Sequence, residues 1–195
     1  MTNTLPVFEL QIDGKESYVD FISLVENPAI EKEFIAFTEN KKIQFSLDDD
    51  RMELLGAAMI PNQLIYRRNE DGFEYNVFFS SDTIRSISQT FFKGGFQSNM
   101  NIEHSATNAD SYVFQSMIVD STKGISLMDL PDGTWVVGVK VLNAEVWQQI
   151  KEGTVKGFSV EGVFALIRKK FTQVKTDEEE VLDLLIQIQN KISKY

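Results

Sequence analysis

The chain has 195 residues, of which 43% are hydrophobic and 25% are charged, so it can bury the core of a globular domain. Its net charge of −10 argues against binding to a nucleic-acid backbone. No apolar run approaches the roughly 20 residues of a membrane-spanning helix, and no signal-peptide pattern opens the sequence. We therefore expect a protein that is neither secreted nor embedded in a membrane.

The composition also excludes several kinds of chemistry. The sequence has no cysteine and one histidine, so disulfides, thiol nucleophiles and Cys/His zinc sites cannot be built from this chain alone. The glycine patterns of nucleotide-binding loops are absent, and the acidic run Asp48, Asp49 and Asp50 lacks the spacing and the turn glycine of a calcium loop. We expect no cofactor and no bound metal.

The first half of the chain predicts strands around one helix. Residues 18–25 form an expected strand, and the apolar runs at 52–60 and 74–79 suggest a hairpin with a long loop. Ser81 is a candidate cap for a helix that ends at Gly94. Its apolar residues recur with helical spacing at Ile84, Ile87, Phe91 and Phe92.

The second half predicts more strands and a short helix. Residues 100–104 and 112–119 are expected to be extended, and 134–141 to form a strand with one buried face. Asn143 is a candidate cap for a helix closed by Gly153, after which residues 157–167 return as a strand. The composition and these elements predict an α+β fold.

The end of the sequence predicts an amphipathic helix. Thr176 and Glu179 form a capping box, and apolar residues follow at steps of four, three and four. This helix either docks on its own domain or pairs with another subunit. We expect an N-terminal segment at 1–46 packed on the core, a main domain at 47–172 and the C-terminal helix at 173–195.

One strand carries two polar residues that could act together. In an extended chain, Ser159 and Glu161 share the face opposite Phe158, Val160 and Phe164. A serine hydroxyl is a weak nucleophile unless a base takes its proton, and His104 is the only imidazole available. Serine catalysis in this chain therefore depends on His104.

Several stretches resemble the caudoviral prohead proteases, most closely the XkdF-like branch of phage capsid-maturation serine proteases. The matching stretches cover most of residues 18–167. They are FISLVENPA (21–29), GAAMIP (56–61), IYRR (65–68), FFS (78–80), NIEH (101–104), GTWVVGVK (133–140) and GFSVEG (157–162). A histidine segment followed by a Gly-Phe-Ser strand is the most distinctive part of this combination.

The resemblance implies a compact, mainly antiparallel β-barrel flanked by helices, similar to herpesvirus assemblin. It implies that His104 is the general base and Ser159 the nucleophile of a serine endopeptidase. Such proteases act inside the phage procapsid, in the host bacterial cytoplasm. They cleave the scaffold protein, often the major capsid protein, and themselves during capsid maturation and virion assembly.

The third catalytic residue remains open at this point. The herpesvirus triad uses two histidines, and this chain has one, so the third member is either an acid or missing. Glu161 is the first candidate, because it lies about 7 Å from Ser159 along the same strand face. Asp120 and Asp110 are the competitors. A Ser–Lys pair using Lys156 or Lys140 is a further catalytic scheme, although Lys156 precedes the predicted strand and nothing evident desolvates it.

A second function would use the same fold without catalysis. The chain could be a catalytically inert head or scaffold-associated structural protein that makes contacts through its C-terminal helix. The two functions differ in whether Ser159 and His104 can approach each other.

Overall fold

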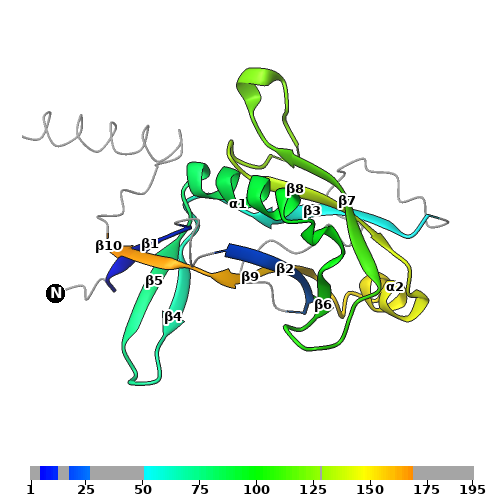
Figure 1. The fold of residues 1–195 in the computed structure, drawn as a ribbon, viewed down its shortest axis with the longest axis horizontal. Coiled ribbons are helices and arrows are strands. Elements are labelled where there is room, and N and C mark those ends of the chain that lie inside the picture. The colour runs from blue at the N-terminus through cyan, green and yellow to red at the C-terminus, as the bar shows by residue number, and fades with distance from the viewer. Residues whose placement is uncertain (1–4, 13–17, 27–50, 128, 169–195) are drawn as a thin grey trace, which may run out of the picture.

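The computed structural model describes residues 5–12, 18–26, 51–127 and 129–168 (Figure 1). The predicted C-terminal helix and the acidic run at 48–50 lie outside these residues. In the described part of the chain, ten strands and two α-helices give an α+β fold. The short 3₁₀ turns η1 (Phe96–Ser98) and η2 (Ser121–Lys123) connect some of them.

The first sheet is built on the N-terminal strand β2 (Tyr18–Val25). Strand β2 pairs in parallel with β6 (Met100–Ile102) and antiparallel with β9 (Gly157–Val163), so the sheet order is β6-β2-β9. Segments distant in the sequence, around residues 23, 101 and 159, therefore become neighbours.

The second sheet places β8 (Trp135–Val141) between β3 (Glu53–Met59) and β7 (Ser111–Ile118). The prediction that only one face of this strand is buried was wrong. Val136 is as fully buried as Trp135, although the two side chains point to opposite faces. The reason is that β8 is a central strand and its second face also carries an apolar residue.

The third sheet has the order β10-β1-β5-β4 and contains β10 (Ala165–Arg168), β1 (Val7–Gln11), β5 (Glu74–Phe78) and β4 (Ile65–Arg68). The predicted hairpin between residues 52–60 and 74–79 was wrong, because β5 pairs with β4 and β1, whereas β3 pairs with β8. The turn between β4 and β5 is closed by Asn69, whose Oδ1 accepts a hydrogen bond from the Phe73 amide at 2.8 Å.

The predicted strand at 157–167 divides at Phe164. Strand β9 belongs to the first sheet and β10 to the third, so the chain changes sheets at this residue. The Phe164 ring packs edge-on against Phe79, with ring centroids 5.0 Å apart. This packing anchors the point at which the chain changes sheets.

Helix α1 (Ser81–Lys93) begins one residue earlier than the predicted cap implied. Ser80, and not Ser81, is the N-cap, and its side chain accepts a hydrogen bond from the Thr83 amide. The predicted apolar face is buried, with Ile84, Ile87 and Phe91 at 0% exposure. Helix α2 (Ala144–Lys151) is capped by Asn143, as predicted.

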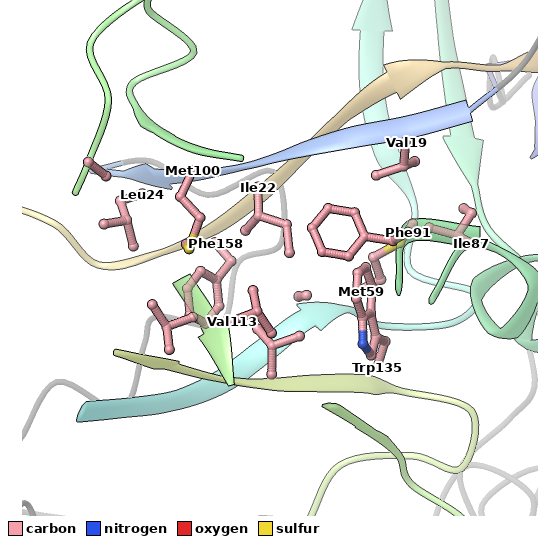
Figure 2. Close-up of a cluster of buried hydrophobic side chains, with 14 of the residues drawn as sticks. Val19, Ile22, Leu24, Met59, Ile87, Phe91, Met100, Val113, Trp135 and Phe158 are labelled. Atoms are coloured by element: carbon pink, nitrogen blue, oxygen red, sulfur yellow. The ribbon is translucent and has the colours of Figure 1, made fainter. Parts of the chain in front are cut away.

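The hydrophobic core lies between the first two sheets and α1 (Figure 2). Ile22, Leu24, Met100 and Phe158 enter it from the first sheet, so one face of that sheet is apolar. The described strands form three separate sheets and do not close into the barrel that the resemblance implied. Strands β3 and β9 lie next to each other, but no hydrogen-bonded ladder joins them among the described residues.

Candidate active site

A row of three polar residues crosses the first sheet. Ser23 on β2 lies opposite Asn101 on β6 and opposite Ser159 on β9. Because side chains alternate along a strand, this row lies on the face opposite Ile22 and Leu24, which enter the core. Side chains directly across neighbouring strands have Cβ atoms about 4.5–5.5 Å apart. The row therefore brings three strands' polar groups within reach of one another.

The carboxylate of Glu161 collects hydrogen bonds from this row. Its Oε1 accepts from the Asn101 amide at 2.7 Å and from the Ser23 hydroxyl. The same oxygen lies 3.2 Å from His104 Nδ1. Glu161 is thus held by groups from β2, from β6 and from the turn that follows β6.

His104 lies in a turn and not on a strand. The extended conformation predicted for 100–104 is confirmed for strand β6, which ends at Ile102, but it was wrong for Glu103 and His104, which both have a φ of 52°. The turn is closed by the Ile102 amide, which donates to the Thr107 carbonyl at 3.1 Å. The Glu103 amide also donates to the Leu24 carbonyl at 3.0 Å, which ties the turn to β2.

This hydrogen-bond pattern favours one position for the proton on the imidazole of His104. His104 Nδ1 faces Glu161 Oε1 at 3.2 Å and Ser23 Oγ at 3.1 Å. The carboxylate can only accept, so Nδ1 must donate, and the Ser23 hydroxyl accepts from Nδ1 while it donates to Glu161. In the neutral ring the other nitrogen, Nε2, then carries the lone pair. His104 is therefore arranged as a base at Nε2.

Electrostatics favour a charged Glu161. Burial raises the pKa of the Glu161 carboxyl, but the hydrogen bonds from Ser23 and Asn101 and the neighbouring His104 outweigh it, so the pKa lies below its ordinary value. An ionised carboxylate next to Nδ1 both orients the ring and stabilises the imidazolium that forms when Nε2 takes a proton.

Ser159 borders a cavity. Ser159 and Glu161 are among the residues that line this cavity of about 480 Å³, and Ser159 is 7% exposed. Ser23, by contrast, is 0% exposed. Among the described residues no hydrogen bond joins Ser159 to His104. Of the two ring nitrogens, Nε2 is the one left to receive a proton from Ser159.

A comparison with known protein families identifies the family to which this chain belongs. Residues 42–168 match the family described as "Putative phage serine protease XkdF". The chain belongs to this family. Asn101, His104, Ser159 and Glu161 all lie within the range that matches the XkdF family, whereas Ser23 precedes it. The resemblance noted in the sequence is confirmed at the level of this phage serine protease family.

A relative in Bacillus subtilis (strain 168), the uncharacterized protein YqbD, is similar to the chain. The two are 24% identical over 173 residues, which is 86% of this chain and 52% of YqbD. The chain therefore spans about half the length of that relative. No solved structure matches the chain significantly.

The competing acids lie elsewhere in the structure. Asp120 pairs with Lys123 at 2.6 Å, and the hydrogen bonds from Lys123 and Thr122 lower its pKa to about 2. Asp110 has a φ of 45° in the segment before β7. Among the described contacts, neither carboxylate meets His104. In this member of the XkdF family, Glu161 is the acid that the fold places beside the histidine.

Among the described residues, no contact supports a catalytic pair of Ser159 with Lys140 or Lys156. Lys140 Nζ donates to the carbonyl of Arg51, and Lys156 precedes β9, where its backbone amide donates to Val25. No described hydrogen bond or ion pair connects either ammonium group to Ser159.

Within the described residues no cluster of three or more His, Asp or Glu side chains could hold a metal ion. No helix there is long and apolar enough to cross a membrane.

Sequence reasoning missed Ser23 and Asn101. Each is the polar residue in an apolar strand segment, Ser23 between Ile22 and Leu24 and Asn101 between Met100 and Ile102. A buried polar group in such a position needs a partner, and that was the available signal. The partners themselves come from strands distant in the sequence, so the pattern of one strand could not identify them.

Proposed function

We propose that the chain is a phage procapsid maturation serine endopeptidase with Ser159 as nucleophile, His104 as general base and Glu161 as the acid that orients the base. The observation that carries this proposal is the contact between Glu161 Oε1 and His104 Nδ1 at 3.2 Å, next to a cavity that Ser159 and Glu161 line. Membership of the XkdF family supports the reaction class.

The first half of the reaction forms an acyl-enzyme. Ser159 Oγ attacks the peptide carbonyl carbon while His104 Nε2 takes the hydroxyl proton. The tetrahedral intermediate then collapses, the C–N bond breaks, and Nε2 returns the proton to the leaving amine. Backbone N–H groups near Ser159 stabilise the oxyanion during this step.

The second half releases the acid product. A water molecule enters where the amine left, His104 Nε2 takes one of its protons, and the hydroxyl attacks the ester carbonyl. Collapse of this intermediate breaks the bond to Ser159 Oγ, which regains its proton from Nε2. Glu161 remains ionised throughout and stabilises the imidazolium in both halves.

Ser23 is a positioning residue in this scheme. Its hydroxyl is fully buried and bonded to both Glu161 and His104 Nδ1, so neither a substrate carbonyl nor Nε2 can use it. Of the three polar residues in the row, Ser159 is the one that lines the cavity. The base available to it is Nε2 of His104.

The proposed setting is the procapsid in the cytoplasm of a host bacterium. The proposed substrates are the phage scaffold protein, the major capsid protein and the protease itself. Self-association through the C-terminal segment belongs to the same proposal. Neither a nucleic acid nor a membrane has a role in it, which agrees with the net charge of −10.

A co-expression experiment tests this function. The chain is produced with the scaffold and capsid proteins encoded beside it, and intact masses are followed over time for the wild type and for Ser159→Ala. Discrete fragments that appear only with the wild type support a serine endopeptidase. If both forms leave every partner and themselves intact while heads assemble, the maturation-protease proposal is wrong.

One observation favours the second candidate, an inert structural head protein. No hydrogen bond joins Ser159 to His104 among the described residues, and Nδ1 already has two partners. Catalytic hydrogen bonds often tighten only when substrate binds, which is the reason we place the endopeptidase first. The same co-expression experiment separates the two, because an inert protein co-assembles with heads and cuts nothing.

A further inference from the structure

The cavity beside Ser159 is built from all three sheets. Residues of β10, β1, β5 and β4 supply one wall, β9 supplies Ser159 and Glu161, and the end of β3 supplies Ala58 and Met59. A volume of about 480 Å³ lies within the range of sites that hold small organic groups. Catalytic and cavity residues therefore share one surface.

Most of the residues that line the cavity are aliphatic or aromatic. Its aliphatic and aromatic residues come from six strands and from the segments that follow β3, β5 and β9. They are Leu10, Ala58, Met59, Ile60, Ile65, Tyr75, Val77, Phe79, Val160, Phe164 and Leu166. Such a wall favours a bulky apolar side chain, because burying it removes apolar surface from water on both sides.

Arg67 is the one cationic residue that lines the cavity among the described residues. Its guanidinium donates to the carbonyl of Tyr66 at 3.1 Å, and no ion pair with a carboxylate is present in the described part of the chain. The neighbouring Arg68 points to the opposite face of β4, because side chains alternate along a strand. In a chain of net charge −10, a cavity arginine without a carboxylate partner is an attractive site for an anion.

We propose that this cavity is the substrate-specificity pocket and that it takes a peptide segment with a bulky aliphatic or aromatic side chain and an acidic residue near the scissile bond. The apolar wall receives the bulky side chain, and Arg67 pairs with the acidic one. This inference rests on the proposed endopeptidase function, since it names the substrate class of the same site.

A binding experiment with the inactive Ser159→Ala protein tests the pocket without requiring cleavage. The probe is a fluorescein-labelled nonapeptide with one leucine and two glutamates in a Gly/Ser background, and binding is measured by fluorescence anisotropy. Replacing the leucine by glycine is expected to weaken binding by about tenfold or more. Replacing both glutamates by lysine is expected to weaken it by about fivefold.

Matched variants locate the binding to this cavity. In the Ser159→Ala background, Arg67→Glu is expected to reverse the preference between the glutamate and lysine peptides, whereas Arg68→Glu leaves it unchanged. Ile65→Trp on the edge strand β4 is expected to reduce the leucine dependence by filling the cavity. Circular dichroism confirms that each variant is folded, and a variant that does not fold is replaced by Arg67→Gln or Ile65→Phe.

The outcomes separate this inference from the function it rests on. Equal binding of the leucine and glycine peptides, no binding at all, or equal effects of Arg67→Glu and Arg68→Glu overturn the pocket proposal. If the wild type cleaves scaffold protein but the probe gives one of these three results, the endopeptidase proposal is supported and the specificity-pocket proposal is wrong. If the probe binds as expected but the wild type cleaves nothing, the pocket stands as a peptide-binding site and the catalytic proposal fails.

Discussion

Ser23 and Ser159 lie directly opposite each other on β2 and β9, yet their surroundings differ. Ser23 is fully buried and bonded to both Glu161 and His104, whereas Ser159 lines the cavity. The two serines are therefore expected to have different roles. Ser23 contacts both the acid and the imidazole, and in the proposed mechanism Ser159 is the serine that reacts with a substrate.

Replacing Glu161 by glutamine tests the role of the acid. The amide keeps the shape of the side chain but removes the charge that stabilises the imidazolium and favours the Nδ1–H form. We expect kcat/KM for scaffold cleavage to fall about 100-fold or more. Asp120→Asn is the matched control and should leave the rate unchanged. Cleavage by Glu161→Gln within a factor of two of the wild type would rule out this assignment.

Replacing Ser23 by alanine tests the positioning role. The change removes one donor to Glu161 Oε1 and one acceptor for Nδ1, but leaves the nucleophile and the base in place. We expect kcat to fall about tenfold or less, in line with the net value of one hydrogen bond, and KM to stay the same. Complete loss of activity in a folded Ser23→Ala protein would indicate that Ser23 is the nucleophile.

The tautomer of His104 can be observed directly, because the chain has a single histidine. Nitrogen-15 chemical shifts of the imidazole at neutral to mildly alkaline pH should report a proton on Nδ1 and a lone pair on Nε2. In Glu161→Gln the populations should move toward the Nε2–H form, which predominates in free histidine. A dominant Nε2–H form in the wild type contradicts the assignment of Nε2 as the base, whether or not the protein cleaves peptides.

The pH dependence of stability follows from the lowered pKa of Glu161. A carboxyl with a lower pKa in the folded than in the unfolded state contributes stability above the unfolded value, about 4.3. That contribution is lost as pH falls through the folded pKa. We therefore expect the difference in unfolding free energy between the wild type and Glu161→Gln to shrink between pH 6 and 3. A difference that is constant over this range argues against a hydrogen-bonded, ionised Glu161.

Gly162 allows the close approach of β9 and β2 beside the site. A Cβ at this position would lie 2.1 Å from the Tyr18 carbonyl oxygen and 2.9 Å from Val19 Cα, both backbone atoms. We expect Gly162→Ala to destabilise the protein by about 1–3 kcal/mol, because the two strands must move apart. Chemical denaturation measures this, and an unchanged midpoint contradicts the pairing of Tyr18 and Val19 with this end of β9.

Local patterns predicted parts of the site and missed others for a physical reason. Ser159 and Glu161 lie two residues apart on one strand, so alternation alone placed them on a common face. Ser23 and Asn101 join them only through pairing between distant strands, which no local pattern records. The turn at His104 escaped prediction because two consecutive non-glycine residues with positive φ are uncommon.

In the fold, too, features set by local sequence patterns were predicted, whereas features set by contacts between distant segments were not. Strands β2, β7 and helices α1 and α2 follow apolar periodicity and capping residues, and they were predicted close to their observed bounds. Strand β4 was missed because three of its four residues are exposed and two of these are arginines. The partners of β3 and β5 depend on which sheet each strand joins, and that is decided by the packing of the whole core.

Labelling with a fluorophosphonate tests the central claim most directly, because this reagent modifies only serines activated by a base. Mass spectrometry of the digested wild-type protein should show one adduct, on the peptide that contains Ser159. The adduct should be absent in Ser159→Ala, strongly reduced in His104→Ala, and retained in Ser23→Ala. An adduct on Ser23, or no adduct under conditions that label a reference serine protease, contradicts the assignment of Ser159 as the activated nucleophile.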